Sequence, residues 1–138
     1  MTTLSAAEAL LAVSGLHLGF QAVVTIVVYP ALVATRPADW DAVHDAHSRR
    51  ISYVVAPLYL VVAAACLWVL VVGPLTAWTL LAMAGHVVAA GTTAAFAAPS
   101  HGRLGRDGPS AAELHRLLTA DRVRLAGTVL AFGAALLA

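Results

Sequence analysis

Lysine is absent from this sequence of 138 residues, so all eight of its basic side chains other than histidine are arginines. Charged residues make up only 11% of the chain and hydrophobic residues 61%. In soluble globular domains, roughly a quarter of the residues are charged. Seven acidic residues leave a net charge of +1, which gives no electrostatic basis for binding a nucleic acid. The composition therefore excludes an ordinary soluble domain.

Cysteine is nearly absent too. The single thiol, Cys66, lies deep in an apolar run, so no intramolecular disulfide and no thiolate metal cluster can form. A cleavable signal peptide is not expected either, because Met1 to Ala9 has no basic region. The apolar run that follows extends to about Tyr29, which is too long for a signal core. We expect this run to remain as a membrane span.

The charges that are present gather in two short polar stretches. The arginines there are Arg36, Arg49 and Arg50 in the first stretch, and Arg103, Arg106, Arg116, Arg122 and Arg124 in or just after the second. Every acidic residue except Glu8 shares these stretches, which leaves four long apolar runs. About 20 apolar residues suffice for a transmembrane helix. The sequence therefore predicts an all-α integral membrane protein, an antiparallel four-helix bundle.

The arginines also predict the topology, because short loops rich in arginine stay on the cytoplasmic side. Two spans separate the polar stretches, so both stretches face the cytoplasm and the two termini face outward. We expect a single domain over residues 1–138, with spans at about 6–30, 51–72, 75–98 and 117–138. The cytoplasmic loops are then 31–50 and 99–116.

Local signals refine these boundaries. Ser5-x-x-Glu8 and Ser110-x-x-Glu113 have the form of capping boxes at helix starts. Residues 38–50 show helical patterning after a proline, which predicts an interfacial helix before the second span. Residues 100–109 contain several glycines and a proline and are expected to form a true loop.

Polar residues recur along one face of the first span. His17, Gln21, Thr25 and Tyr29 follow one another at intervals of four, which places them in one stripe. Polar and ionisable side chains are costly in lipid and normally face the interior of a bundle. We expect this stripe to line a helix contact or a path.

His86 in the third span is predicted to lie at the same depth as His17. Each is 13 residues before a proline, Pro30 or Pro99, or roughly 20 Å from the cytoplasmic boundary at 1.5 Å per residue. Two such imidazoles could bind haem iron axially, or hold copper or iron with Gln21 completing the shell. Alternatively, each is a neutral histidine that forms a hydrogen bond across the bundle.

A second group of polar residues lies at the cytoplasmic boundary. The candidate metal ligands there are His44, His47, His101 and His115. They would hold copper or iron if the two loops fold over the same end of the bundle. Asp41 or Asp45 would act as a further ligand or as a hydrogen-bond acceptor behind one. The alternative is a solvated surface held by salt bridges.

Two arginines open the fourth span, where each needs an anionic or carbonyl partner. Arg122 shares a helical face with His115 and Thr119, so we expect it to bind an anionic group of a substrate. Arg124 is expected to contact lipid or to have a structural role. Asp121 is expected to point toward a neighbouring face.

Several short motifs, in this order, resemble a known group of proteins. They are Tyr29-Pro30, Trp40 with His44 and His47, Pro99-Ser-His101-Gly-Arg103-Leu, and Asp121-Arg122-Val-Arg124. The chain resembles small four-span bacterial membrane proteins similar to the anthrone oxygenase-like family, whose fungal members oxidise polycyclic phenols. Asp121 departs from that pattern, in which asparagine is more common. The resemblance implies oxidation of a small apolar metabolite in the bacterial cytoplasmic membrane, with His44, His47, His101 and Arg122 at the site.

We therefore expect a membrane-embedded oxidoreductase or oxygenase that uses histidine-bound copper or iron. Arg122 or Arg103 would orient an anionic group, and Tyr29 would supply a proton or a hydrogen bond. One alternative is a cytochrome b-like electron carrier with haem between His17 and His86, and another is a non-catalytic subunit or small transporter. The expected partners are a small apolar or phenolic substrate, membrane lipids and a second copy of the chain.

Overall fold

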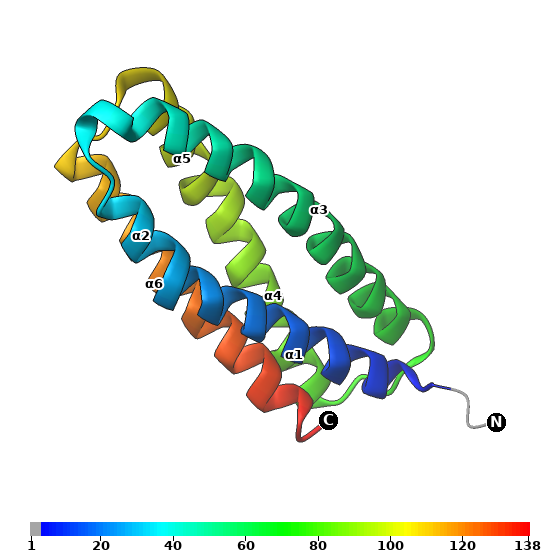
Figure 1. The fold of residues 1–138 in the computed structure, drawn as a ribbon. Coiled ribbons are helices and arrows are strands. Elements are labelled where there is room, and N and C mark those ends of the chain that lie inside the picture. The colour runs from blue at the N-terminus through cyan, green and yellow to red at the C-terminus, as the bar shows by residue number, and fades with distance from the viewer. Residues whose placement is uncertain (1–3) are drawn as a thin grey trace.

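The computed structural model describes residues 4–138, which contain helices, turns and no strand (Figure 1). The helices join end to end into four long rods that pack side by side. Rod one comprises α1 (Ala6–Val23), η1 (Val24–Val28) and α2 (Tyr29–Val33); rod two, η2 (Pro37–Asp39) and α3 (Trp40–Val72); rod three, α4 (Ala77–Thr92), η3 (Thr93–Ala97) and α5 (Ala98–Asp107); and rod four, α6 (Ala111–Ala135). The predicted all-α, four-helix architecture is confirmed over these residues.

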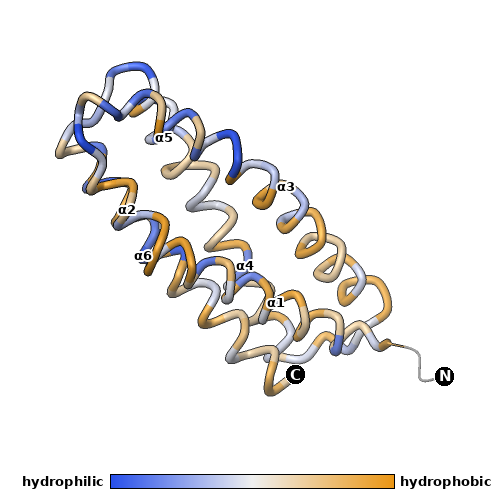
Figure 2. The backbone as a smooth tube through the Cα atoms, viewed as in Figure 1, coloured by the Kyte–Doolittle hydropathy of each residue, from blue (hydrophilic) through white to orange (hydrophobic). Residues whose placement is uncertain are grey.

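Of the described rods, the first three are long and apolar enough to cross a membrane. Figure 2 shows apolar residues along the rods and polar residues concentrated at the end where α2, α5 and the start of α3 meet. Large apolar side chains also cover the outside of the bundle, such as Leu60 at 72% and Val71 at 71% exposure. A surface of this kind supports an integral membrane protein. The fourth rod, α6, is less apolar because its first half carries most of its charges.

The prediction of a loop over residues 100–109 is wrong, because helix α5 continues to Asp107. Tertiary contacts hold this helix: Leu104 is fully buried, and its carbonyl accepts a hydrogen bond of 3.0 Å from Trp40 Nε1. Gly105 allows close packing rather than a turn, since a Cβ there would lie 3.3 Å from Cε1 of His44. The helix ends at Gly108, whose φ of 78° suits glycine.

The predicted interfacial helix and the second span are one continuous helix. After the short η2, α3 runs for 33 residues and includes Pro57. Its buried side chains are Trp40 and His44 at one end and Leu58, Val62, Ala65 and Val69 toward the other. No side chain of α3 is buried between residues 45 and 57. Along that stretch α3 is therefore not packed tightly against the bundle.

Two π-helical segments, η1 and η3, lie next to the cavity described below. After each segment there is one intervening residue and then a proline, Pro30 or Pro99. Proline has no N–H, and its ring crowds the carbonyl four residues earlier. A wider helical turn relieves this crowding. The two segments are separated along the chain by 69 residues, the same separation as between His17 and His86. Rods one and three therefore repeat one local pattern.

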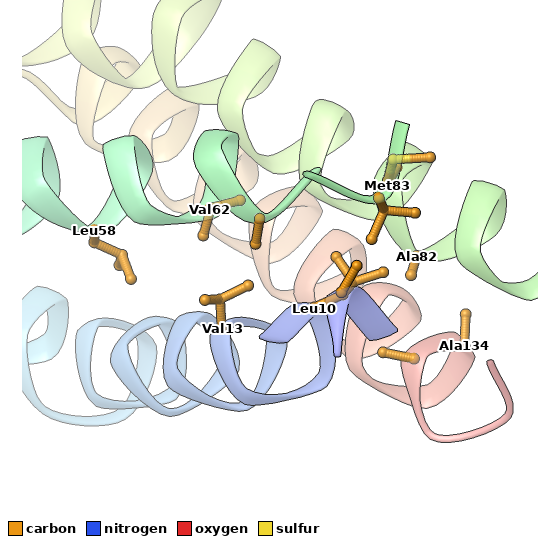
Figure 3. Close-up of a cluster of buried hydrophobic side chains, with 11 residues drawn as sticks. Leu10, Val13, Leu58, Val62, Ala82, Met83 and Ala134 are labelled. Atoms are coloured by element: carbon orange, nitrogen blue, oxygen red, sulfur yellow. The ribbon is translucent and has the colours of Figure 1, made fainter. Parts of the chain in front are cut away.

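The tightest helix contact joins α4 to α6 through glycines. A Cβ on Gly85 would lie 2.5 Å from the carbonyl oxygen of Gly127, so the two backbones meet directly. Figure 3 shows the apolar core in the half of the bundle nearer the chain ends. Its labelled members are Leu10 and Val13 of α1, Leu58 and Val62 of α3, Ala82 and Met83 of α4, and Ala134 of α6. This core holds the bundle together away from the polar end.

Candidate functional site

At the polar end, four aromatic rings from three different helices converge. His101 of α5 lies 5.5 Å from His44 and 5.4 Å from His47, both on α3, measured between ring centroids. Tyr29, at the start of α2, lies 5.9 Å from His101 and 6.3 Å from His47. The two polar stretches of the sequence therefore fold over the same end of the bundle and bring three of the predicted site histidines together.

A chain of hydrogen bonds links these rings to Arg124. The Arg124 guanidinium donates to the Tyr29 hydroxyl at 2.9 Å, and that hydroxyl lies 3.3 Å from Nε2 of His101. Nδ1 of His101 lies 3.3 Å from Nε2 of His44. Because arginine cannot accept a hydrogen bond, the Tyr29 proton is free to point at His101. If the Tyr29 proton is donated to Nε2 of His101, a neutral His101 carries its own proton on Nδ1 and donates it to His44.

Arg124 is anchored by a buried acid, which corrects two expectations. It donates to Asp121 at 3.0 Å, and the same Asp121 oxygen accepts a hydrogen bond of 2.7 Å from Gln21. Both partners of the ion pair are buried, at 6% and 2% exposure. Arg122, which was expected at the site, is exposed. Asp121 does not point away toward another face, and Arg124 rather than Arg122 enters the site.

A cavity of about 360 Å³ opens beside this network. Its polar lining includes Tyr29, His47, His101 and Arg124. The remaining lining is mostly apolar or small: Phe20, Val24, Ser48, Ile51, Ser52, Val55, Ala56, Thr93, Ala97 and Ala98. A largely apolar cavity with a few convergent polar groups is the usual form of a small-molecule site.

Three buried polar atoms of the cavity-lining residues have no hydrogen-bond partner within residues 4–138. They are Nε2 of His47, Oγ of Ser48 and Nε of Arg124. A buried polar group without a partner costs free energy, so native proteins rarely retain one without a reason. The imidazole nitrogen of His47 can accept a hydrogen bond from a hydroxyl group, and the guanidinium N–H of Arg124 can donate one to the hydroxyl oxygen or to its anion. The two groups together suit a ligand with an acidic hydroxyl.

The other predicted site residues lie elsewhere. Arg103 forms an ion pair of 2.9 Å with Glu113, which ties α5 to the start of α6. His115 lies in a separate groove with Thr119 and Phe96. Asp41 is exposed. Asp45 lies 3.9 Å from Nδ1 of His44, too far for a hydrogen bond, with a side chain that is 75% exposed.

The ionisation of Glu113 reflects its arginine partners. Burial raises the pKa of this carboxyl. Hydrogen bonds from Arg103 and Ser100, together with the positive charge of Arg103, lower the pKa by more than burial raises it. A second ion pair, 2.6 Å from Arg116, acts in the same direction. The pKa of Glu113 is therefore below its ordinary value, and the acid is charged at neutral pH.

His17 and His86 lie at the same depth, as predicted, and they meet in the core of the bundle. Their Nδ1 atoms are 3.0 Å apart, and Nε2 of His86 lies 2.9 Å from the Ser14 hydroxyl. An ion between two opposed imidazoles needs bonds of about 2.0 Å on each side, and thus nitrogens about 4 Å apart. This pair, joined directly, does not fit a haem between the rings. Gln21 bonds to Asp121 and Thr25 instead.

The histidines at the cavity do not form a ready metal site either. Within residues 4–138, no three His, Cys, Asp or Glu side chains are placed to hold one ion. The nitrogens of His44 and His101 that face each other are joined by a hydrogen bond, which occupies the lone pair that a metal would need. The copper or iron expected from the sequence stays a prediction, and no chemical step is derived from it.

The chain was compared with protein-family models, with proteins of curated function and with solved structures, and none of them matches it. The resemblance to the anthrone oxygenase-like family therefore stays a prediction. The function has to be inferred from the cavity and the network beside it.

Proposed function

We propose that this protein is an integral membrane enzyme of the oxidoreductase or oxygenase type. In this proposal the cavity binds a small apolar molecule that carries an acidic hydroxyl group, such as a fused-ring phenol. The observation that carries the proposal is a set of three unpartnered polar atoms, Nε2 of His47, Oγ of Ser48 and Nε of Arg124, on residues that line a largely apolar cavity. The apolar lining would hold the rings, and the polar end would hold the hydroxyl.

The polar end would work by removing a proton. His47 has a ring nitrogen available to accept the hydroxyl proton, and the Arg124 charge stabilises the anion that remains. Asp121 and Tyr29 fix the guanidinium in place, so little reorganisation is needed when a ligand binds. Loss of the proton makes a phenol easier to oxidise. The oxidation itself needs an electron acceptor, for which the oxygenase class implies dioxygen.

The topology that goes with this proposal is N-out and C-out in the cytoplasmic membrane of a bacterium, with α6 embedded beside the three apolar rods. Arginines at the polar end of the bundle support this orientation. Alkaline phosphatase fused after Ala138 should be active, because the enzyme needs the oxidising exterior, and a cytoplasmic reporter at the same position should be inactive. The reverse pattern would overturn the orientation.

The binding proposal can be tested with 2-naphthol, a fused-ring phenol, and with naphthalene, which has the same rings without the hydroxyl. Detergent-purified protein is titrated with each compound, and the absorption spectrum of bound naphthol reports whether it has lost its proton. We expect 2-naphthol to bind about 10-fold more tightly, since a hydrogen bond to a charged group contributes about 1.5–3 kcal/mol. We also expect the spectrum of the naphtholate.

A His47→Gln variant should bind 2-naphthol without forming naphtholate at neutral pH, whereas a His115→Gln variant should behave like the native protein. His115 is the matched control because it is exposed and lies outside the cavity. Equal affinities for naphthol and naphthalene would mean that the polar end does not recognise a hydroxyl, and the proposal would then fail.

A further inference from the structure

We infer that the cavity opens sideways into the lipid bilayer, through a window between α3 and the segment formed by η3 and α5. Its ligand enters by this route as a molecule dissolved in the membrane. The inference rests on the proposed membrane enzyme and adds where its substrate comes from. Four features of the bundle carry it.

The first feature is the way α3 packs. Its side chains are buried at Trp40 and His44 and again from Leu58 onward, but at no position from 45 to 57. The cavity occupies that stretch, because the α3 residues that line it are His47, Ser48, Ile51, Ser52, Val55 and Ala56. In Figure 1, α3 runs along the outside of the bundle as a separate rod. The cavity is therefore the space that α3 leaves between its two packed ends.

The second feature is a pair of hydrogen bonds that frame this space. At the polar end, Trp40 Nε1 donates to the carbonyl of Leu104 at 3.0 Å. At the deep end, the hydroxyls of Tyr59 and Thr93 lie 2.6 Å apart and join α3 to the start of η3. These contacts hold α3 at a fixed spacing from rod three on both sides of the cavity. The opening between them is thus a built part of the fold.

The third feature is the direction of the opening. No residue of rods one and four that lines the cavity is exposed: Phe20 is half-buried, and Val24, Tyr29 and Arg124 are buried. The lining residues that are exposed, Ser52 and Ala56 on α3 and Ala98 on α5, belong to the opposite side. The mouth of the cavity therefore lies between α3 and α5. These three rim residues, a serine and two alanines, have small side chains that leave the mouth open.

The fourth feature is the surroundings of the mouth. Ala56 lies roughly 8 Å along α3 from Ile51, the first residue of the expected second span. One turn further along α3 lies Leu60, which is 72% exposed. An opening with this rim faces hydrocarbon rather than water. A lipid acyl chain is a poor permanent occupant, because it would leave the polar atoms of His47 and Arg124 unpaired.

Fluorescence quenching tests the window without any ligand. On a Cys66→Ser background, Ala56→Cys and Ala98→Cys are each labelled with the fluorophore NBD and reconstituted into liposomes. Lipids with brominated acyl chains quench from the membrane, and iodide quenches from water. Leu67→Cys, on the exposed apolar surface of α3, is the control for lipid contact, and Asp45→Cys is the control for water contact.

We expect brominated lipids to quench Ala56→Cys about as strongly as Leu67→Cys, with little quenching by iodide. Ala98→Cys, at the end of the expected third span, should be quenched by brominated lipids less than Ala56→Cys but more than Asp45→Cys. Adding 2-naphthol should reduce lipid quenching at the rim and leave it unchanged at Leu67→Cys. Quenching by iodide at the level of Asp45→Cys would show that the mouth opens to water, and quenching by neither would show that it is closed. Either result overturns the window. If lipid quenching holds but 2-naphthol neither binds nor protects, the proposed function fails and the window stands.

Discussion

Arg124 and Tyr29, which lie on α6 and α2, are joined by a hydrogen bond of 2.9 Å from the guanidinium to the phenol oxygen. Because arginine only donates, the Tyr29 oxygen accepts at this contact and the Tyr29 proton is free for another partner. The Tyr29 hydroxyl also contacts His101, which in turn contacts His44. Tyr29 thus links the buried ion pair of α6 to the histidines of α3 and α5, and it does so at the wall of the cavity.

The Tyr29→Phe substitution tests this link. It removes the acceptor of Arg124 and the donor to His101 while keeping the ring. We expect the affinity for 2-naphthol to fall about 10-fold, which corresponds to about 1.4 kcal/mol, since Arg124 loses one of the contacts that position it. Titration of the purified variant measures this loss. Tyr53→Phe is the control, because Tyr53 is 76% exposed on α3 and should have no effect. Unchanged affinity in Tyr29→Phe would mean that the hydroxyl does not position the site.

Arg124→Gln should destabilise the bundle by about 3–5 kcal/mol, because it leaves Asp121 buried without its charge partner. Arg122→Gln, two positions away and exposed, should change the stability by less than about 0.5 kcal/mol. Unfolding in detergent measures both. The double variant with Asp121→Asn should recover part of the loss, since no unpaired charge then remains. If Arg122→Gln were the more harmful change, our assignment of the buried arginine would be wrong.

The contrast between these two arginines shows where the sequence stops being informative. Helical periodicity correctly groups His115, Thr119 and Arg122 on one face, but it does not say which face meets the bundle. That is decided by the small residues Gly127 and Ala131, which allow α6 to approach α4. Arg124 and Asp121 turn inward with them. In the sequence, Gly127 and Ala131 on the same helical face as Arg124 were the signal that this face of α6 packs against the bundle.

Other features were predictable because they depend on short-range rules. Long apolar runs predicted the helical rods, and equal spacing from two prolines predicted that His17 and His86 lie at one depth, where they touch. Helix α5 was not predictable, because its glycines resemble turn signals. It is held by contacts with Trp40 and His44, which are distant in sequence. Long-range packing overrides local preference there.

Gly85→Ala should destabilise the protein because α4 and α6 meet at this position without side chains. The new Cβ would lie 2.5 Å from the Gly127 carbonyl oxygen and 2.7 Å from the Ala131 nitrogen, and neither backbone atom can move freely. Overpacking of this kind costs about 1–3 kcal/mol. Gly133→Ala on α6 is the matched control, since its Cβ would meet nothing within 4 Å. Unfolding experiments on both variants would contradict the close contact if their stabilities were equal.

Removal of metal distinguishes proton transfer by histidine from the copper or iron expected from the sequence. The proposed binding of 2-naphthol depends on protein side chains and not on a metal, so dialysis against a chelator should leave its affinity unchanged. Elemental analysis before and after dialysis shows whether copper or iron was removed. A loss of binding that copper or iron restores would show that the histidines act through a metal. It would also require them to rearrange from the hydrogen-bonded geometry of His44 and His101.

Glu113→Gln should lower the stability at neutral pH in a way that disappears in acid. The pKa of Glu113 lies below its ordinary value of 4.5, because Arg103 and Arg116 stabilise the charged form more than burial opposes it. A lowered pKa in the folded state adds stability above pH 4.5, and this contribution is lost as the pH falls through the folded value. Melting temperatures of the two proteins should therefore differ at pH 7 and converge below pH 4.5. Asp107→Asn, an exposed acid at the end of α5, is the control and should give no such convergence. Parallel curves for Glu113→Gln and the native protein would show that its ion pairs do not hold α5 against α6, and the packing of α5 would then depend on Trp40 and His44 alone.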